Sequence, residues 1–151
     1  MQSSYTANAS RRKLALFESG HLLCGLDIIH VREINKNIAV TVVHRVPEYV
    51  RGVINLRGEI VTVVDLRTKF GFPPLEQEAE EQIVIVRCGD ENIGLLVDSV
   101  RDVVIADEND IEPTPPNLSG VPGHFFTGIY KLDQGLVAIL NIESLLAREF
   151  E

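Results

Sequence analysis

The fold is decided by the stretch Gly52-Val-Ile-Asn-Leu-Arg-Gly-Glu-Ile-Val-Thr-Val-Val-Asp-Leu-Arg-Thr-Lys-Phe70. Its β-branched residues, interrupted by one turn signal, predict a hairpin of two strands followed by a short helix. The expected elements are a strand at residues 53–55, a turn at Arg57-Gly58, a strand at 60–64 and a helix between Asp65 and Gly71. Gly58 can adopt the positive φ that a tight hairpin requires, and Asp65 is a suitable N-cap. The turn therefore presents a cation, Arg57, at its tip, which is a recognition feature rather than a catalytic one.

The same pattern returns near the C-terminus. Residues 128–146 align without gaps with residues 52–70 at an offset of 76 (128 − 52), and residues 89–102 align with residues 20–33 at an offset of 69 (89 − 20). Self-similarity of this kind indicates a duplicated β module. Asp133 of the second copy stands where the first copy has Arg57. This difference marks the turn at Arg57 as the candidate recognition site.

The duplication predicts the domain organisation. A polar N-terminal tail at residues 1–12 is expected to be disordered, followed by one domain at 13–151. Within it, the first copy covers about residues 13–72, a linker 73–82 and the second copy about 83–148. Each copy is too small to bury a full core alone, so the two should share buried surface, and strands could be exchanged between them.

Composition limits the function. The 151 residues carry a formal net charge of −8, from 14 basic and 22 acidic side chains, which argues against nucleic acids and anionic membranes as partners. No run reaches the ~18–20 apolar residues of a membrane span. The two cysteines fit reduced thiols in an intracellular protein. We therefore expect a cytoplasmic protein without direct membrane insertion.

Short strands at close spacing, with few helices, indicate an all-β fold of small barrels. Residues 27–32 fit either one helical turn or a bent strand, and residues 47–50 fit a single helical turn. A short helix is expected from Asn141. The other strands are expected at residues 14–17, 22–26, 38–43, 83–87, 92–97, 100–105, 127–132 and 136–140.

The residues that could carry chemistry lack the partners that chemistry needs. The four histidines are scattered without metal-ligand spacing, and Cys24 lies inside an apolar strand. Cys88 has no histidine recruited as its base. Glu59 and Asp65 are better explained as a turn-flanking surface residue and a helix cap. The sequence therefore predicts no catalysis, no metal site and no cofactor.

Arg57 has two interpretations. An arginine at a hairpin tip is commonly solvated or paired locally, and such surface pairs are weak. The apolar frame of Val53, Ile54, Leu56 and Ile60 would instead hold the turn rigidly, and arginine is enriched at binding hot spots.

The segment from Val50 to Phe70 resembles the signature of the CheW family, the adaptors of bacterial chemotaxis arrays. Three further segments match that family in order: Gly25-Leu-Asp-Ile-Ile-His-Val-Arg-Glu-Ile34, Gly94-Leu-Leu-Val-Asp-Ser-Val-Arg-Asp-Val103 and Leu140-Asn-Ile-Glu-Ser-Leu-Leu146. The resemblance covers about residues 13–148. It implies two SH3-like five-stranded β-barrels with a third apolar core between them, short helices after the long hairpins, and no enzymatic activity. Such an adaptor couples chemoreceptors to the histidine kinase CheA.

The resemblance also implies site residues. Arg57 and Glu33 should lie near each other on one face and contact the cytoplasmic tip of a receptor. The implied receptor-binding residues are Val31, Glu33, Ile34, Gly52, Arg57, Gly58, Gly94 and Val100. CheA, whose regulatory domain is itself a CheW-like pair of barrels, should dock on an exposed apolar patch of one barrel. The residues expected in this patch are Leu14, Leu16, Ile38 and Val40. The adaptor should be monomeric alone and be recruited to receptor arrays at the membrane.

Three positions depart from the family pattern. Thr62 replaces a proline common in the long strand, which should only restore a backbone donor. Glu112 and Asn117 stand where a basic and an aromatic residue often join kinase and adaptor into rings. Because no receiver domain follows in the 151 residues, we expect an adaptor without the CheV-type fusion.

Three other functions remain open. A coupling protein of a related chemosensory pathway, such as twitching or gliding motility, would have the same fold. A generic SH3-like peptide-binding module would use its acidic loops to select basic ligands. An enzyme acting on a small molecule is the weakest alternative.

Overall fold

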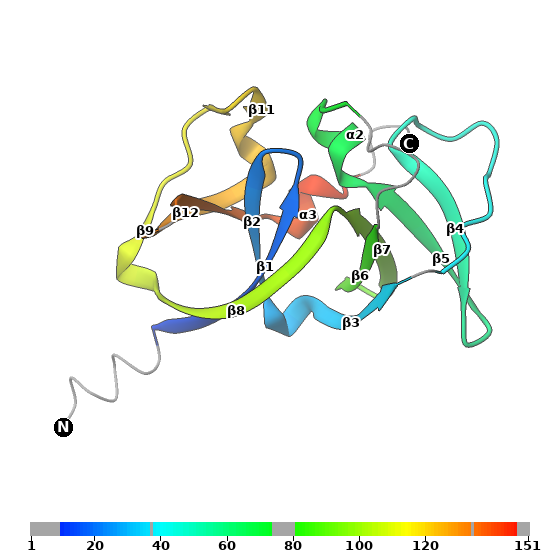
Figure 1. Ribbon diagram of the computed structural model, residues 1–151, viewed down its shortest axis with the longest axis horizontal. Coiled ribbons are helices and arrows are strands. Elements are labelled where there is room, and N and C mark those ends of the chain that lie inside the picture. Colours follow the sequence, from blue (N-terminus) through cyan, green and yellow to red (C-terminus); the bar gives the residue numbers. More distant parts are fainter. Residues whose placement is uncertain (1–9, 37, 74–80, 134, 148–151) are drawn as a thin grey trace.

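The computed structural model describes residues 10–36, 38–73, 81–133 and 135–147. Two strongly curved sheets dominate this part of the chain and form two small barrels side by side (Figure 1). The predicted all-β fold with two small barrels and few short helices is confirmed.

The first barrel is a six-stranded sheet with the strand order β8-β1-β2-β13-β12-β9. β13 pairs in parallel with β2 and so joins β8, β1 and β2 to β12 and β9. The strands are β1 (Arg11–Ser19), β2 (Leu22–Asp27), β8 (Ser99–Asp107), β9 (Ile111–Glu112), β12 (Phe126–Leu132) and β13 (Gly135–Leu140).

The second barrel is a five-stranded sheet with the order β3-β6-β7-β5-β4. Here β5 pairs in parallel with β7, with Val63 opposite Gly94. The strands are β3 (Val31–Lys36), β4 (Val50–Leu56), β5 (Glu59–Asp65), β6 (Gln82–Cys88) and β7 (Glu91–Val97).

Each barrel therefore contains strands from both halves of the sequence. The five-stranded sheet takes β3, β4 and β5 from the first half and β6 and β7 from the second, and the chain then continues into the six-stranded sheet with β8 (Figure 1). The remaining elements are β10 (Asn117–Leu118), β11 (Val121–Pro122), the helices α2 (Leu66–Phe70) and α3 (Ile142–Leu145), and 3-10 turns at Ile28–His30, Glu108–Asp110 and Gly123–Phe125.

The apolar core has three parts among the described residues. One lies within the five-stranded sheet around Val61 and Ile85, and another within the six-stranded sheet around Leu14 and Ile139. The largest contains side chains of both sheets, such as Phe17 of the six-stranded sheet and Leu95 of the five-stranded sheet. This shared cluster corresponds to the apolar core expected between the barrels, and its burial stabilises their association.

The deciding hairpin forms as its sequence predicts. Arg57 and Gly58 both have positive φ, 51° and 86°, as a two-residue hairpin turn of the I′ kind requires. Asp65 caps α2 by accepting a hydrogen bond from the backbone N–H of Thr68. Gly71 ends the helix in the left-handed conformation at φ 85°.

Other local expectations need correction. Residues 38–43 form no strand beyond an isolated bridge between Thr41 and Val53, because this segment leaves the sheet after Lys36. Residues 47–50 make a turn, with the N–H of Val50 donating to the carbonyl of Pro47, rather than a helical turn. Between β2 and β3 the chain makes a 3-10 turn, which decides between the two interpretations of residues 27–32.

The segments expected to lie outside the barrels are described only in part. The tail expected at 1–12 overlaps β1, which begins at Arg11, and residues 1–9 lie outside the described residues. Most of the expected linker, residues 74–80, also lies outside them.

Candidate partner-binding surfaces

Arg57 and Glu33 form an ion pair on the surface of the five-stranded barrel. Both Nη atoms of Arg57 donate to the carboxylate of Glu33, one of them to Oε1 at 3.3 Å. Asn35 donates a further hydrogen bond to Glu33, at 2.9 Å. The predicted proximity of Arg57 and Glu33 is thus confirmed.

The pair leaves the arginine accessible. The side chain of Arg57 is 72% exposed, while that of Glu33 is more covered. The hydrogen bonds from Arg57, followed by that from Asn35, lower the pKa of Glu33, and the same pairing raises the pKa of Arg57. Asn55 accepts a hydrogen bond from the N–H of Gly58 at 2.9 Å, which stiffens the turn. The turn therefore holds a charged, oriented guanidinium toward solvent.

The other expected receptor-binding residues fall into two groups. Ile34 is exposed beside Glu33 on β3, and Gly58 is exposed beside Arg57. Val31 and Val100 are half-buried against the shared core. The structure therefore brings Glu33, Arg57 and Gly58 to one surface. Ile34 follows Glu33 in β3 and is exposed on the opposite face of the strand, and Val31 and Val100 are only partly accessible.

Gly52 and Gly94 are buried and serve packing. A Cβ on Gly94 would lie 2.9 Å from a methyl group of Ile83. A Cβ on Gly52, whose φ is +154°, would lie 2.1 Å from the carbonyl oxygen of Thr41. Neither glycine presents a side-chain site to a partner, and both are required by the close approach of neighbouring chain segments.

Leu14 and Leu16 were expected on an exposed apolar patch, and this expectation is wrong. Leu14 is 0% exposed and Leu16 is also buried, both inside the six-stranded barrel. The physical reason is that β1 lies between β8 and β2, and Phe17 on its other face packs into the shared core. Both faces of β1 are therefore buried at this end of the strand.

Ile38 and Val40 are half-buried rather than exposed. They pack against the core of the five-stranded sheet and line a small hollow of about 180 Å³ together with Arg51 and Glu81. Their outer surfaces are therefore accessible only in part.

The exposed apolar residues of this region lie further along the same loop, and sequence reasoning missed them. Val42 is 66% exposed, and Val43 and Val46 are also exposed. The loop is fixed to β4 by two backbone hydrogen bonds between Thr41 and Val53, of 2.8 and 2.9 Å. The signal in the sequence was a β-branched run that resembles a strand; without a partner strand, it becomes an apolar surface loop.

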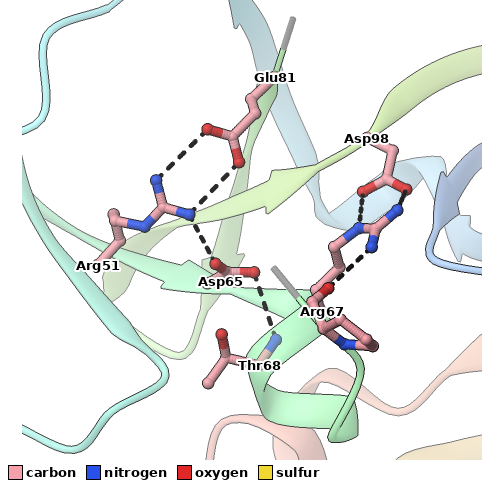
Figure 2. A network of polar contacts seen from close by, with 7 residues as sticks. Arg51, Asp65, Arg67, Thr68, Glu81 and Asp98 are labelled. Carbon is pink, nitrogen blue, oxygen red and sulfur yellow. Dashed lines mark hydrogen bonds and ion pairs between the residues drawn. The ribbon is translucent and has the colours of Figure 1, made fainter. Parts of the chain in front are cut away.

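Two polar networks brace the region around α2 (Figure 2). In the first, Arg51 on β4 donates to the helix cap Asp65 at 2.7 Å and pairs with Glu81 at 3.4 Å. Among the described residues, Asp65 is the only charged one that is buried. Its pairing with Arg51 and its capping bond to Thr68 satisfy a carboxylate that would otherwise be costly to bury.

The second network joins the two barrels. Arg67 on α2 holds Asp98 in a fork, with Nε–Oδ1 at 2.8 Å and Nη2–Oδ2 at 2.7 Å, as Figure 2 shows. Asp98 also accepts a hydrogen bond from the N–H of Gly20, in the β1–β2 turn, at 2.9 Å. The hydrogen bond to Asp98 raises the pKa of Arg67. Because Asp98 stands between β7 and β8, this contact lies where the chain crosses between barrels.

The two thiols are not activated. Burial of Cys24 strongly raises the pKa of its thiol, and desolvation, together with Glu143 and Glu91, raises that of Cys88. A thiol with a raised pKa is a poor nucleophile because little thiolate forms. Among the described residues, no cluster of three or more His, Cys, Asp or Glu side chains could hold a metal ion. Within the same part of the chain, helices are too short or too polar to span a bilayer.

Comparison with known proteins shows what the chain as a whole is similar to. Residues 13–150 match the family model described as CheW-like domain. The probable chemotaxis protein CheW of Rhizobium etli is 31% identical over 140 residues, covering 93% of this chain and 90% of that protein. The chemotaxis protein CheW of Helicobacter pylori is 34% identical over 125 residues, covering 83% of this chain and 75% of that protein.

A solved structure shows the same architecture. The crystal structure of the scaffolding protein TtCheW from Thermoanaerobacter tengcongensis is similar with a TM-score of 0.85 and 35% sequence identity. The match covers 93% of this chain and 95% of that one.

Proposed function

The chain belongs to the CheW family, and we propose that it is a non-enzymatic adaptor that couples chemoreceptors to the histidine kinase CheA in bacterial chemotaxis. The observation that supports this most directly is the accessible Arg57 on a rigid turn, held in position by Glu33. An oriented arginine on a stiff frame is suited to partner recognition because little side-chain freedom is lost on binding.

The proposed receptor-binding surface is centred on this pair. Leu56, next to Arg57, is a partly buried apolar residue that lines the same hollow as the pair. Gly58 leaves the tip of the turn open, because nothing lies within 4 Å of its Cβ position. The surface thus combines a central charge with an apolar neighbour, a common composition of transient interfaces. Gly52 and Gly94 would support this surface indirectly, by allowing close packing of the neighbouring chain segments.

The proposed kinase-binding surface is separate. Val40 and Ile38, at the base of the loop between β3 and β4, border the exposed residues Val42, Val43 and Val46. Contiguous exposed apolar side chains are typical of interaction sites. We place kinase docking on this loop, and Leu14 and Leu16 are no longer part of the proposal.

The proposal extends to the assembly. The adaptor would be a cytoplasmic monomer recruited to receptor arrays. At the position of the ring-forming contact, Glu112 pairs with Lys131 at 3.0 Å, and Asn117 caps the turn to Gly120. Both side chains have local roles, so we expect this chain to form the second kinase contact weakly.

Co-sedimentation tests the proposal. Membranes containing the chemoreceptors of the same organism are incubated with CheA, with or without this protein, and then pelleted. An adaptor raises the amount of CheA in the pellet. A generic peptide-binding module would bind without raising CheA recovery, and an unchanged CheA signal would therefore contradict the proposal. Repeating the assay with receptors of a motility system would identify the pathway.

A further inference from the structure

The Arg57–Glu33 pair lies at the edge of a larger hollow that carries two more arginines. This hollow has a volume of about 480 Å³ and is lined by both members of the pair together with Arg32 and Arg87. The same two arginines also line a neighbouring hollow of about 470 Å³, which reaches Asp27 at the end of β2 in the other barrel. Arg32 and Arg87 therefore connect the receptor-facing surface to the seam between the barrels.

The backbone explains why these two side chains lie together. Arg32 is on β3 and Arg87 on the neighbouring strand β6. Val31 pairs with Val86, and the register shifts between Val31 and Glu33, so Arg32 occupies an irregularity of the ladder. Both arginines are exposed at this end of the sheet.

The carboxylates of the hollow already have partners. Glu33 is paired with Arg57 and Asn35, and Glu59 accepts a hydrogen bond from Asn92 at 3.2 Å. In the neighbouring hollow, Asp27 is paired with Arg12 at 3.1 Å. Glu143 also lines that hollow, where its charge contributes to the raised pKa of the Cys88 thiol.

The two additional arginines lack such partners. The side chain of Arg32 makes no hydrogen bond or ion pair with any residue in the described part of the chain. The Nε of Arg87 donates to the carbonyl of Gly89 at 3.1 Å. Among the described residues, the Arg87 side chain has no carboxylate partner. The hollow therefore offers guanidinium donors in excess of the acceptors that the protein itself provides.

We propose that Arg32 and Arg87 bind the carboxylates of an acidic segment on the partner that docks at Arg57. This inference rests on the proposed function and names the chemistry of that partner. Two arginines on neighbouring strands suit carboxylates because each guanidinium can form two parallel hydrogen bonds. The net charge of −8 repels extended polyanions such as nucleic acids, so discrete side-chain carboxylates are the favoured ligand. A locally basic hollow on an acidic protein adds selectivity to the docking.

The first experiment probes the site without a receptor. A hexaglutamate peptide with blocked ends is titrated into the full chain, and the Nε–H signals of the arginines are followed by NMR. Those of Arg32 and Arg87 should shift and that of Arg45, an exposed arginine on the β3–β4 loop, should not. A hexaglutamine peptide should have no effect, and added salt should weaken the response. Absence of a shift at Arg32 and Arg87 would overturn the site.

The second experiment uses matched variants and the cytoplasmic region of a receptor. The variant Arg32→Gln/Arg87→Gln should bind both probes about three- to tenfold more weakly, as expected for exposed ion pairs. The variant Arg11→Gln/Arg45→Gln removes the same two charges elsewhere on the exposed surface and should bind normally. Equal loss in both variants would show an effect of net charge alone and overturn the proposal.

The proposed function and the proposed arginine site can be tested separately. If the unmodified chain does not bind the receptor region, the proposed function is wrong, while the hexaglutamate titration still decides whether the arginine site exists. If the receptor binds the Arg32→Gln/Arg87→Gln variant as tightly as the unmodified chain, the receptor does not use this site and the inference is overturned. Thermal unfolding confirms that each variant is folded.

Discussion

Arg57 and Glu33 connect opposite edges of the five-stranded sheet. Glu33 lies on β3 at one edge, and Arg57 lies in the turn of the β4–β5 hairpin at the other, yet their side chains form an ion pair. The contact therefore links the β4–β5 turn to β3. Because the pair is exposed, it contributes more to the orientation of the turn than to the stability of the fold.

Replacement of Arg57 tests whether the ion pair matters for partner binding more than for the stability of the fold. We expect Arg57→Ala to weaken receptor binding by about ten- to hundredfold, as for a hot-spot arginine, with nearly unchanged thermal stability. Titration of a receptor fragment and thermal unfolding measure the two effects. Arg57→Lys is the matched comparison, since it keeps the charge and loses the bidentate geometry. Binding of Arg57→Ala at the unmodified strength would contradict the proposed surface.

Glu33 gives the ion pair a pH dependence. Its pKa is lowered in the folded protein, first by the hydrogen bond from Arg57. The stabilisation from the ionised form is therefore fully present above the unfolded pKa of about 4.3 and is lost as the pH falls through the lower folded pKa. We expect the difference in melting temperature between the unmodified chain and Glu33→Gln to be constant near neutral pH and to vanish in acid. A difference in melting temperature that grows on acidification would contradict a lowered pKa of Glu33.

Gly52 should act through the loop rather than through contact with a partner. A Cβ added there meets the carbonyl oxygen of Thr41 at 2.1 Å, so Gly52→Ala must displace the loop or β4. We expect a loss of about 1–3 kcal/mol in unfolding free energy, measured by urea denaturation, and faster hydrogen exchange at the amide of Thr41.

Gly58→Ala is the control for this prediction. Gly58 also has a positive φ, of 86°, but nothing lies within 4 Å of its Cβ position. Its replacement therefore adds conformational strain without a clash, and the amide of Thr41 should stay protected. Equal stability and equal exchange in the two variants would show that the close approach at Gly52 is unimportant.

The exposed loop offers the test of kinase binding. Val42→Asp changes a side chain that is 66% exposed, so we expect an intact fold, weakened binding of CheA and unchanged receptor binding. Leu14→Asp is informative as a contrast, because it places a charge in a barrel core and should unfold the protein. Binding of CheA to folded Val42→Asp at full strength, measured by calorimetry, would move the docking surface away from this loop.

Local signals explain what the sequence predicted correctly. The β4–β5 hairpin, the cap at Asp65 and the stop at Gly71 depend on residues within a few positions of one another, so their chemistry can be read directly. The proximity of Arg57 and Glu33 was accessible only through the family resemblance, since nothing local joins residues 24 positions apart.

Long-range pairing explains the errors. Whether residues 38–43 form a strand depends on an available sheet edge, and only Thr41 finds a backbone partner there. Leu14 and Leu16 lie on a strand that is covered on both faces, which alternation of apolar residues does not reveal. The pairing of Arg67 with Asp98 also escaped prediction, because each residue was assigned to a motif of its own.

Asp98 should be the main polar link between the barrels. Its removal in Asp98→Ala leaves the fork of Arg67 and the N–H of Gly20 without an acceptor at a largely covered site. Hydrogen bonds to charged groups contribute about 1.5–3 kcal/mol, so we expect a loss of that size in urea denaturation. The control is Arg101→Ala on β8, which breaks a more exposed pair with Glu18 and should cost about 1 kcal/mol or less.

Unfolding of Asp98→Ala should nevertheless remain a single transition. Each barrel contains strands from both halves of the chain, and the largest apolar cluster contains side chains of both sheets, so neither barrel can unfold and leave the other complete. Fluorescent probes attached at Ile60 in one barrel and Leu136 in the other, both exposed positions, report the two separately. Coincident transitions at a lowered midpoint are expected. Separate transitions would show that the Arg67–Asp98 contact, rather than the shared core, makes the two barrels one cooperative unit.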